Sequence, residues 1–378
     1  MSARLKVVFC TDGIFPHAVG GMQKHSKLLI EEIARMNVVD LVVIHPHHNT
    51  KVFAPELNIK EHGINRGKKY WSYLYNEYNY SIKVYKILKN YTDAVIYSQG
   101  LSVWHGISKI GHRLIINPHG LEFLQAITLK TKFKALRFEW IFRRIFNRAA
   151  KVVSLGGRLT PLLRSIVKDA GNKVVVLPNA VNLPSERKDR TFNSKPMQLL
   201  FVGRFAANKG IDVLMQAIES LNKEGYKNEL HFNLIGKGPL YEHYTKNFQA
   251  PNITYHGFAD DDALVQAYEQ NDIFVLPTLF EGMPTVILEA MTHSMPVIVT
   301  DTGATTELVN HLNGYIIEKK EFKSLKAAIT TYYLLDEDKK KKMSDESYRK
   351  VSEKFTWNVV ARQHFDLFKS FSEEVRRR

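Results

Sequence analysis

Several features are missing from the sequence, and each absence excludes a class of protein. Cys10 is the only cysteine among 378 residues, so no disulfide can form within the chain, and a reducing compartment is expected. No run of about 18 apolar residues occurs, and the start MSARLKVVFC lacks the regions of a signal peptide, so we expect no membrane-spanning helix and no secretory leader. GxxxxGK[ST] is absent and no GxGxxG follows the first predicted strand, which disfavours a P-loop NTPase and an ordinary dinucleotide dehydrogenase.

Acidic residues are scarce in the first half of the chain. Residues 1–190 contain 30 Lys and Arg against 13 Asp and Glu, whereas the remainder contains 23 against 25. The whole excess behind the net charge of +15 therefore lies in the first half, which predicts an anionic partner for that half alone. Because no nucleic-acid-binding motif accompanies this charge, we expect no nucleic-acid partner.

Short apolar runs alternate with helical patterns along the chain. This alternation predicts an α/β protein whose parallel sheets are covered by helices on both faces, and the length suits two such domains. We expect strands at 5–10, 41–45, 94–98, 114–117, 152–155 and 174–177, and then at 199–202, 231–235, 273–276 and 297–300. The polar segment 182–196 separates the two series, so the predicted domains are 1–185 and 186–355.

Ligands of doubly wound sheets bind beyond the carboxyl ends of the strands, and chemically useful residues follow several of these ends. Gly20 and Gly21 precede a predicted helix, and His119 follows a strand and a proline. Arg204 and Lys209 stand next to glycines before another helix, a pattern typical of phosphate sites because backbone amides and cations can meet an anion there. Taken singly, each has a structural alternative, such as a surface ion pair for Arg204 or a turn for the glycines.

The stretch LFEGMPTVILEAM at 279–291 places Glu281 and Glu289 eight positions apart. Two carboxylates could indicate a glycosidase, but on one helix they would lie about 12 Å apart, beyond the roughly 5–9.5 Å that glycosidases need. Gly282 and Pro284 instead predict that Glu281 ends a loop and that Glu289 lies in the following helix. The two carboxylates would then contact different parts of one long ligand, with amides around Gly282–Val286 between them.

Together these pieces resemble the retaining glycosyltransferases of family 4, which have the GT-B fold of two Rossmann-like domains facing across a cleft. The resemblance extends over nearly the whole chain, and the Glu-x7-Glu element in that ordered company is its most specific part. The matching segments are the Gly20-Gly21 loop, His119-Gly120, LPNAVN at 177–182, FVGRFAANKG at 201–210, LIGKGP at 234–239, HGF at 256–258, LPTLFEGMPTVILEAM at 276–291 and PVIVTDTGATTEL at 296–308. The sequence departs from the family at Ala304, where a second glycine is frequent.

The resemblance implies a nucleotide-sugar donor, with UDP the commonest base in the family, held mainly by the second domain. The implied donor-binding residues are Gly20, Gly21, Arg204, Lys209, Gly282, Met283, Pro284, Thr285 and Glu289. Arg204 and Lys209 would bind the diphosphate and Glu289 the ribose, while Glu281 and His119 would lie at the transferred sugar as the catalytic residues. The first domain would bind the acceptor, and the final helix, 356–378, would pack back on it.

No metal or other cofactor is expected, and retention would proceed by front-face attack with the leaving phosphate accepting the proton. His45, His47 and His48 could bind a metal ion, but a solvated loop is the favoured interpretation of HPHH. Alternatives to a transferase for a lipid-linked or cell-surface glycan remain open: a sugar-phosphate or disaccharide synthase acting on a soluble acceptor, or a non-catalytic scaffold of this fold.

The segment 130–151 predicts a basic amphipathic helix, with eight Lys and Arg residues and one acidic residue, Glu139. Its apolar residues are expected to form one stripe: Phe133, Leu136, Trp140, Ile141 and Ile145. Such a helix could lie on an anionic membrane, which predicts a cytoplasmic enzyme at the inner face of the cell membrane. Packing with a solvated basic face is the alternative. The tyrosine-rich stretch 70–91 indicates either core packing or a stacking surface for the acceptor.

Overall fold

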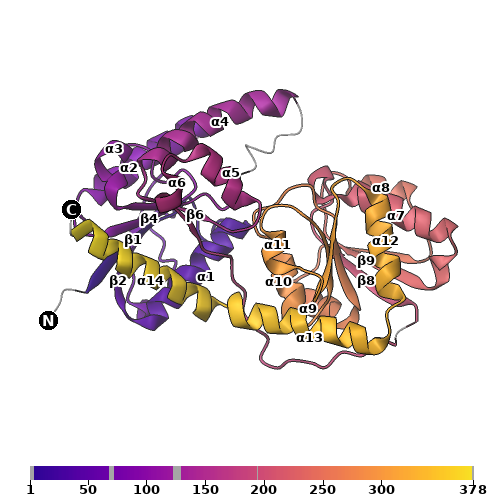
Figure 1. Cartoon of the computed structure of the whole chain (residues 1–378). Coiled ribbons are helices and arrows are strands. Elements are labelled where there is room, and N and C mark those ends of the chain that lie inside the picture. Colours follow the sequence, from indigo (N-terminus) through magenta and orange to yellow (C-terminus); the bar gives the residue numbers. More distant parts are fainter. Residues whose placement is uncertain (1–3, 68–71, 122–128, 194, 377–378) are drawn as a thin grey trace. The chain divides into compact units, whose positions relative to one another are not determined.

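The protein forms two compact units, each built on its own sheet (Figure 1). The computed structural model describes residues 4–67, 72–121, 129–193 and 195–376. Unit 1 contains residues 1–179 and 357–378, and unit 2 contains residues 180–356. The predicted boundary at residues 185 and 186 falls in a segment whose described residues, 182–193 and 195–196, contain no helix and no strand.

Unit 1 contains a parallel seven-stranded sheet with the order β3-β2-β1-β4-β5-β6-β7. Its strands are β1 (Leu5–Cys10), β2 (Val39–His45), β3 (Lys60–Gly63), β4 (Val95–Gln99), β5 (Leu114–Asn117), β6 (Lys151–Ser154) and β7 (Val174–Val176). The central strands are buried on both faces, which explains their continuous apolar runs. The sequence pattern missed β3 because KEHG is an edge strand with no apolar run.

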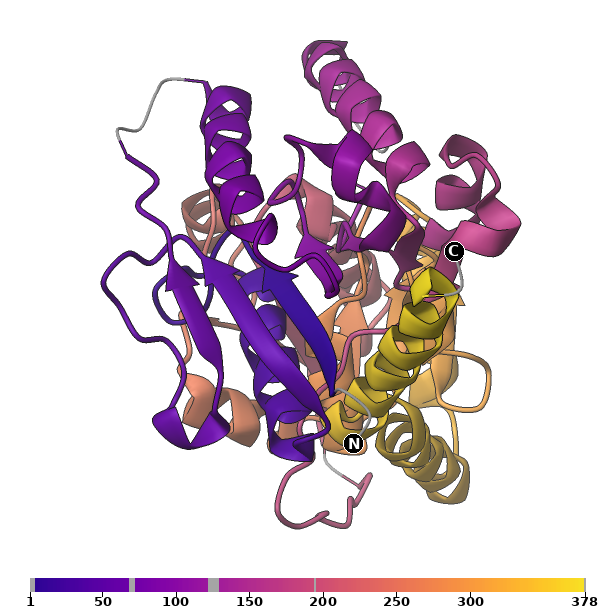
Figure 2. The same cartoon turned by 90° about the vertical axis from the view of Figure 1, so that its left-hand side faces the viewer.

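The helices of unit 1 are α1 (Gly21–Met36), α2 (Tyr73–Leu88), α3 (Ile107–Ile110), α4 (Leu129–Arg148), α5 (Leu159–Ile166), α6 (Ala170–Lys173) and α14 (Trp357–Arg376). Figure 2 shows the last of these, α14, running beside the sheet, where it packs against α1, β1 and β4. Phe368 of α14 is fully buried, with its ring 5.9 Å from Phe9 of β1 and 5.5 Å from Tyr97 of β4. The end of the chain thus completes the core that surrounds the first strand.

Unit 2 contains a parallel six-stranded sheet with the order β10-β9-β8-β11-β12-β13. Its strands are β8 (Met197–Val202), β9 (Leu230–Ile235), β10 (Ile253–Gly257), β11 (Ile273–Leu276), β12 (Val297–Thr300) and β13 (Gly314–Ile317). Neither β10 nor β13 was predicted, and both lie at the edges of the sheet. Each edge strand is partly exposed and short of the continuous buried apolar run that marks the central strands: β10 reads ITYHG and β13 reads GYII.

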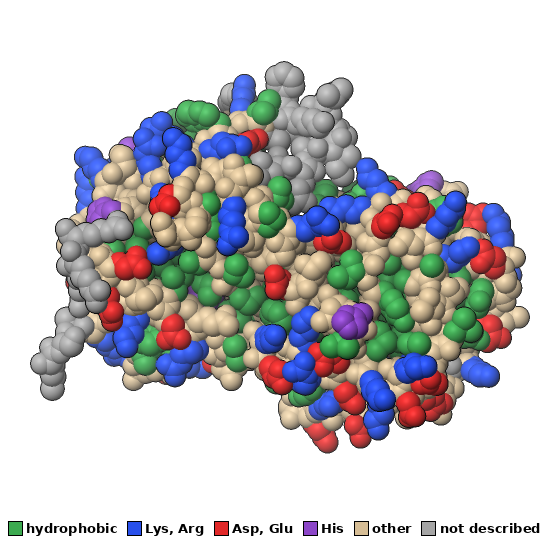
Figure 3. Space-filling view, in the orientation of Figure 1, with side chains coloured by type: hydrophobic (Ala, Val, Ile, Leu, Met, Phe, Trp, Pro, Cys, Tyr) green, Lys and Arg blue, Asp and Glu red, His purple; other side chains and the backbone are tan. Residues whose placement is uncertain are grey.

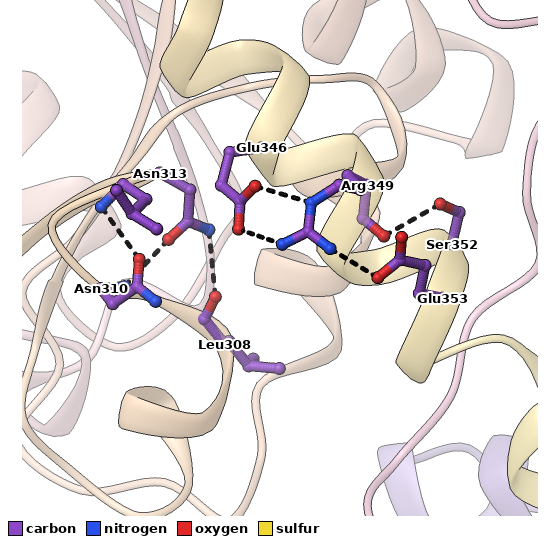
Figure 4. A network of polar contacts seen from close by, with 8 residues as sticks. Leu308, Asn310, Asn313, Glu346, Arg349, Ser352 and Glu353 are labelled. Atoms are coloured by element: carbon purple, nitrogen blue, oxygen red, sulfur yellow. Dashed lines mark hydrogen bonds and ion pairs between the residues drawn. The ribbon is translucent and has the colours of Figure 1, made fainter.

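The helices of unit 2 are α7 (Ile211–Lys223), α8 (Tyr241–Asn247), α9 (Asp261–Gln270), α10 (Thr285–Thr292), α11 (Thr305–Leu308), α12 (Phe322–Tyr333) and α13 (Glu337–Lys354). Figure 4 shows polar contacts within α13 and in the turn after α11. Arg349 of α13 is forked onto Glu346 and also pairs with Glu353. In the turn after α11, Asn313 donates to the carbonyl of Leu308 at 3.0 Å. No helix within the described residues is long and apolar enough to cross a membrane.

Candidate functional site

In unit 2 the predicted site residues gather where the strand order reverses. Strand β8 lies between β9 and β11, so the loops after β8 and β11 leave the sheet in opposite directions and open a crevice at their carboxyl ends. Arg204 and Lys209 belong to the first loop, and Glu281 belongs to the second. The loops are joined because Thr278 Oγ1 and the amide of Leu279 both donate to the carbonyl of Asn208, at 2.9 and 2.8 Å.

Lys209 and Glu281 form an ion pair across these two loops. The ammonium of Lys209 contacts Glu281 Oε1, and this oxygen also lies 3.1 Å from Thr278 Oγ1. Both side chains are mostly covered, with 22% and 14% of their surfaces exposed. The sequence predicted separate roles for the two residues and did not predict their contact. Arg204 is exposed, which leaves its guanidinium accessible at the same end of the sheet.

Gly210 allows the two loops to approach each other. It has a φ of +70° and caps α7, and a Cβ there would lie 1.8 Å from the carbonyl oxygen of Pro277. Any side chain would therefore separate the loop that carries Lys209 from the loop that carries Glu281. The pattern Lys209-Gly210 was chosen from the sequence as part of a phosphate site, and the structure gives this glycine a packing reason of its own.

Glu289 lies in the middle of α10, eight positions after Glu281, which lies in the loop before the helix. Its Oε2 accepts a hydrogen bond of 2.9 Å from the hydroxyl of Tyr268. Tyr268 comes from α9, is 2% exposed and stacks on His293 with 5.5 Å between ring centroids. Burial and the neighbouring carboxylate of Glu289 raise the pKa of Tyr268 well above its usual value, so the phenol keeps its proton to donate. No sequence pattern pointed to Tyr268.

The segment between the two glutamates ends at the N-terminus of α10. The sequence predicted that Pro284 lies in the first turn of this helix. In the structure the helix begins one residue later, at Thr285, and Pro284 is its N-cap residue. Met283 and Pro284 are buried, whereas Gly282 and Thr285 are partly exposed. The first amides of a helix have no partner within it, so this end of α10 can bind the oxygens of a ligand.

The loop after β12 supports the turn that carries Glu281. Ala304 donates its amide hydrogen to the carbonyl of Gly282 at 2.8 Å. Gly303 has a φ of +54°, and a Cβ on it would lie 2.3 Å from the carbonyl oxygens of both Glu281 and Gly282. At position 304 the φ is −103°, a conformation open to any residue, which explains why alanine is accommodated where the family frequently has glycine.

In unit 1 the predicted residues also lie beyond the carboxyl ends of strands. Gly20 caps α1 and Gly21 is its first residue, and both are exposed. His119 follows β5 with a left-handed φ of +59°. Its ring packs edge-on against His25 with 4.7 Å between centroids. Burial, followed by the nearby His364, lowers the pKa of His119 to about 3, so its imidazole is neutral at physiological pH.

A pair of carboxylates next to the Gly20-Gly21 loop was not predicted from the sequence. Asp12 follows β1 and accepts a hydrogen bond from Gln23 at 3.3 Å. Arg66 donates to Glu77 Oε1 and to the backbone carbonyl of Asp12, both at 2.7 Å. Burial and the charge of Glu77 outweigh Arg66 and raise the pKa of Asp12 to about 6. A lone aspartate after a strand carries no sequence signal that would single it out.

The histidines of the HPHH segment are engaged within the fold, and the expectation of a solvated loop is wrong for His45. This residue is fully buried at the end of β2, with its Nε2 3.1 Å from Glu61 Oε2. His47 Nε2 accepts from the amide of Ile14 at 2.9 Å, and His48 Nδ1 lies 3.2 Å from the carbonyl of Gly63. Among the described residues, no group of three or more His, Cys, Asp or Glu side chains is arranged to hold a metal ion.

The predicted single stripe on α4 is wrong. Ile141 and Ile145 are buried, together with Phe142 and Phe146, whereas Leu136 and Trp140 are 60% and 63% exposed. The two pairs lie on different sides of the helix because residues of about four-residue spacing share a face, and 136 and 140 are out of phase with 141 and 145. The side chain of Phe133 lies outside the described part of the chain.

The tyrosine-rich stretch is partly buried and partly exposed. Tyr80, Tyr85 and Tyr91 are buried in unit 1, whereas Tyr73 and Tyr75 are about half exposed. Tyr73 stacks on Phe138 of α4 with 6.0 Å between ring centroids. Core packing is therefore confirmed for three of the tyrosines, and a stacking surface for the acceptor stays a prediction for the two exposed rings.

In comparisons with known proteins, each half of the chain matches a glycosyltransferase family model. Residues 19–184 match the model of "Glycosyltransferase Family 4", and residues 196–334 match that of "Glycosyl transferases group 1". Among curated proteins, the putative teichuronic acid biosynthesis glycosyltransferase TuaC of Bacillus subtilis is 27% identical over 272 residues, which are 69% of this chain and 63% of TuaC.

Two solved structures match the fold over nearly the whole chain. A sucrose-phosphate synthase from Thermosynechococcus elongatus has a TM-score of 0.75 at 17% identity, covering 97% of this chain and 99% of that one. HepE from Anabaena, in complex with UDP and glucose, has a TM-score of 0.69 at 16% identity, covering 97% and 100%. These matches, with the two parallel sheets, confirm the predicted pair of Rossmann-like domains of the GT-B fold.

Proposed function

Because the chain belongs to glycosyltransferase family 4, we propose that it transfers a sugar, with retention of configuration, from a nucleoside-diphosphate sugar to a lipid-linked or cell-surface glycan. Two contacts in unit 2 carry the proposal. Lys209 pairs with Glu281 where the strand order reverses, and Glu289 of α10 accepts a hydrogen bond from Tyr268 of α9. One cation and two carboxylates thus stand at one end of one sheet. This set suits a ligand that has a diphosphate at its centre and hydroxyl-rich rings at both sides.

In the proposed donor complex, Arg204 and Lys209 bind the diphosphate, and Glu289 binds the ribose hydroxyls. The amides of Gly282, Met283 and Thr285 meet oxygens of the phosphate and the sugar. Pro284 sets the direction of α10 and contributes no amide hydrogen. In unit 1, Gly20 and Gly21 are assigned to the diphosphate, and His119 to the transferred sugar.

The reaction breaks the bond between the anomeric carbon and the phosphate oxygen, and forms a bond from the acceptor oxygen to the same face of that carbon. The acceptor's proton passes to the departing phosphate. Negative charge grows on the diphosphate as the bond breaks, so fixed cations there stabilise the transition state more than the ground state. Glu281 orients the sugar and the neutral ring of His119 contacts it near the anomeric centre.

Calorimetry with UDP tests the donor site. Replacing Arg204 by alanine removes a charge-assisted contact worth about 1.5–3 kcal/mol, so UDP should bind roughly 10- to 100-fold more weakly. Lys223 is an exposed lysine of α7 paired with Glu219, and Lys223→Ala is the matched control, with unchanged affinity expected. Unchanged UDP affinity in the Arg204 variant would refute the diphosphate assignment. Turnover of a nucleotide sugar that persists in EDTA would support the proposed independence of a metal ion.

The face of α4 that carries Leu136 and Trp140 supports a membrane-bound acceptor. Both side chains are mostly exposed, Arg137 is exposed beside them, and the guanidinium of Arg144 lies 5.9 Å from the centre of the Trp140 ring. Figure 3 shows Lys and Arg side chains gathered over the part of unit 1 that contains α4. Exposed apolar tips among cations are typical of a helix that lies in the interface of an anionic membrane.

Vesicle sedimentation tests this peripheral attachment at the cytoplasmic face. Wild-type protein should sediment with vesicles of phosphatidylcholine and phosphatidylglycerol, and not with phosphatidylcholine alone. Replacing Leu136 and Trp140 by alanine should abolish sedimentation. Leu334→Ala, at a 73% exposed leucine of unit 2, should leave it unchanged. Equal sedimentation of the double variant and the wild type would refute the role of α4.

A further inference from the structure

Three buried side chains of unit 1 form a hydrogen-bonded network that ends at His119. We call Asn117, Tyr97 and His364 the Asn117 network. They come from β5, β4 and α14, and each is at most 1% exposed. Asn117 Nδ2 lies 3.0 Å from the Tyr97 hydroxyl, and that hydroxyl lies 3.1 Å from His364 Nε2. At the other end, Asn117 Oδ1 accepts the amide hydrogen of His119 at 2.9 Å.

The direction of every hydrogen bond in the Asn117 network follows from one fixed point. His364 Nδ1 lies 2.8 Å from the carbonyl oxygen of Val360, which can only accept, so Nδ1 carries the proton. Burial lowers the pKa of His364 to about 4, so its ring is neutral and Nε2 must accept. Tyr97 therefore donates to Nε2 and accepts from the amide group of Asn117. That orientation turns Oδ1 of Asn117 toward the amide of His119.

The last of these bonds holds an unfavourable backbone conformation. His119 has a φ of +59°, and a left-handed conformation costs a residue with a Cβ about 1–2 kcal/mol. A bond from an asparagine oxygen to the amide two residues ahead is the turn that stabilises such a bend. Pro118 between them fixes its own φ, so the bond from His119 to Asn117 restrains the backbone from which the ring of His119 projects.

The ring of His119 is held from the same helix that supplies His364. It packs on His25 of α1, and His25 packs on Trp357 at the start of α14, with 5.2 Å between ring centroids. Helix α14 therefore controls His119 in two ways, through hydrogen bonds to its backbone and through ring packing to its side chain.

We propose that Asn117, Tyr97 and His364 are positioning residues for His119, and that the C-terminal helix α14 thereby sets the geometry of the catalytic histidine. The proposal rests on the proposed function, in which His119 contacts the transferred sugar. It adds three residues to those that the resemblance implied for the site and gives the last helix of the chain a role in the active site.

Nuclear magnetic resonance of protein labelled with [15N]histidine tests the network without any substrate. The spectrum should show His364 neutral and protonated at Nδ1. In Asn117→Asp the carboxylate cannot donate, so Tyr97 must donate to it and Nε2 of His364 should become protonated. The backbone amide of His119, assigned from the loss of its signal in His119→Gln, should exchange with solvent at least tenfold faster in Tyr97→Phe. Unchanged exchange in that variant, or a wild-type His364 protonated at Nε2 alone, would overturn the proposal.

Hydrolysis of UDP-glucose and UDP-galactose measures the consequence for catalysis. Misplacing a catalytic group by about 1 Å can cost on the order of 100-fold in rate, so Tyr97→Phe should lower kcat at least tenfold while KM changes less than threefold. The control is Tyr332→Phe, which removes an equally buried tyrosine hydroxyl bound to the carbonyl of Asp272 in unit 2.

Equal kcat values for Tyr97→Phe and Tyr332→Phe would refute positioning, because loss of stability alone affects both variants. If the wild type hydrolyses neither sugar, neither of them is its donor. The exchange rate of the His119 amide still decides whether the network positions this residue.

Discussion

Replacing Gly303 by alanine should damage the donor site through the backbone alone. At a φ of +54° an alanine costs about 1–2 kcal/mol relative to glycine. Its Cβ would also lie 2.3 Å from two carbonyl oxygens, those of Glu281 and Gly282. Relieving such an overlap in a packed region costs about 1–3 kcal/mol, which gives a total of roughly 2–5 kcal/mol.

Gly225 provides the matched control for the conformational part of this cost. Its φ is +95°, and a Cβ there would have no atom within 4 Å. Gly225→Ala should therefore cost about 1–2 kcal/mol and nothing more. In a unit of this size about 1 kcal/mol corresponds to roughly 2–4 °C in Tm, so the overlap cost of about 1–3 kcal/mol should make the Gly303 variant melt roughly 2–12 °C below the Gly225 variant.

Thermal unfolding and UDP calorimetry on the full chain measure the two consequences together. The Gly303 variant should bind UDP more weakly, because the overlap displaces the turn between Glu281 and the N-terminus of α10. The Gly225 variant should bind as the wild type does. Equal melting temperatures and equal UDP affinities for the two variants would refute the reasoning that the loop after β12 supports this turn.

Three smaller predictions follow. Tyr268→Phe should weaken UDP binding about 5- to 10-fold, because Glu289 loses its hydroxyl partner; unchanged calorimetry would contradict this. Ala304→Gly should shift Tm by less than about 3 °C, because φ at that position suits both residues. Folding raises the pKa of Asp12 to about 6 from its usual value of about 4. Between these two pH values the folded state keeps the proton on Asp12, whereas the unfolded state has lost it. Stability should thus fall, relative to Asp12→Asn, by up to about 3 kcal/mol between pH 4 and pH 7 in urea titrations.

The sequence predicted the buried strands well because burial on both faces imposes a continuous apolar run. Strands 5–10, 114–117, 273–276 and 297–300 appear with the predicted bounds. The edge strands β3, β10 and β13 were missed because one exposed side relaxes that requirement. The same reasoning explains α4, where the spacing of apolar residues predicted a single face although two of them are exposed. Periodicity reports which residues can share a face, and only packing decides which face is covered.

The sequence predicted residues of the candidate site that lie in loops directly after strands, and it missed residues that come from elsewhere in the fold. Arg204, Lys209 and Glu281 could be selected because loops at the carboxyl ends of a parallel sheet meet. Tyr268 could not, because its contact with Glu289 joins two helices, α9 and α10, and leaves no local pattern in the sequence. The Asn117 network is a stronger case, since His364 lies 245 positions after His119 in the numbering of the chain and comes from a helix selected only as a packing element.

The contact between Lys209 and Glu281 changes how the two residues share the proposed donor. An ammonium group has several hydrogen-bond donors, so Lys209 can keep one bond to Glu281 and direct another to a phosphate oxygen. The carboxylate in turn has a second oxygen for a sugar hydroxyl. A contact between the two side chains is therefore compatible with both roles and orients each of them, because neither long side chain must be ordered anew when the donor arrives. The pair would act as one unit, and the loss of either partner would affect the binding of the diphosphate and of the sugar together.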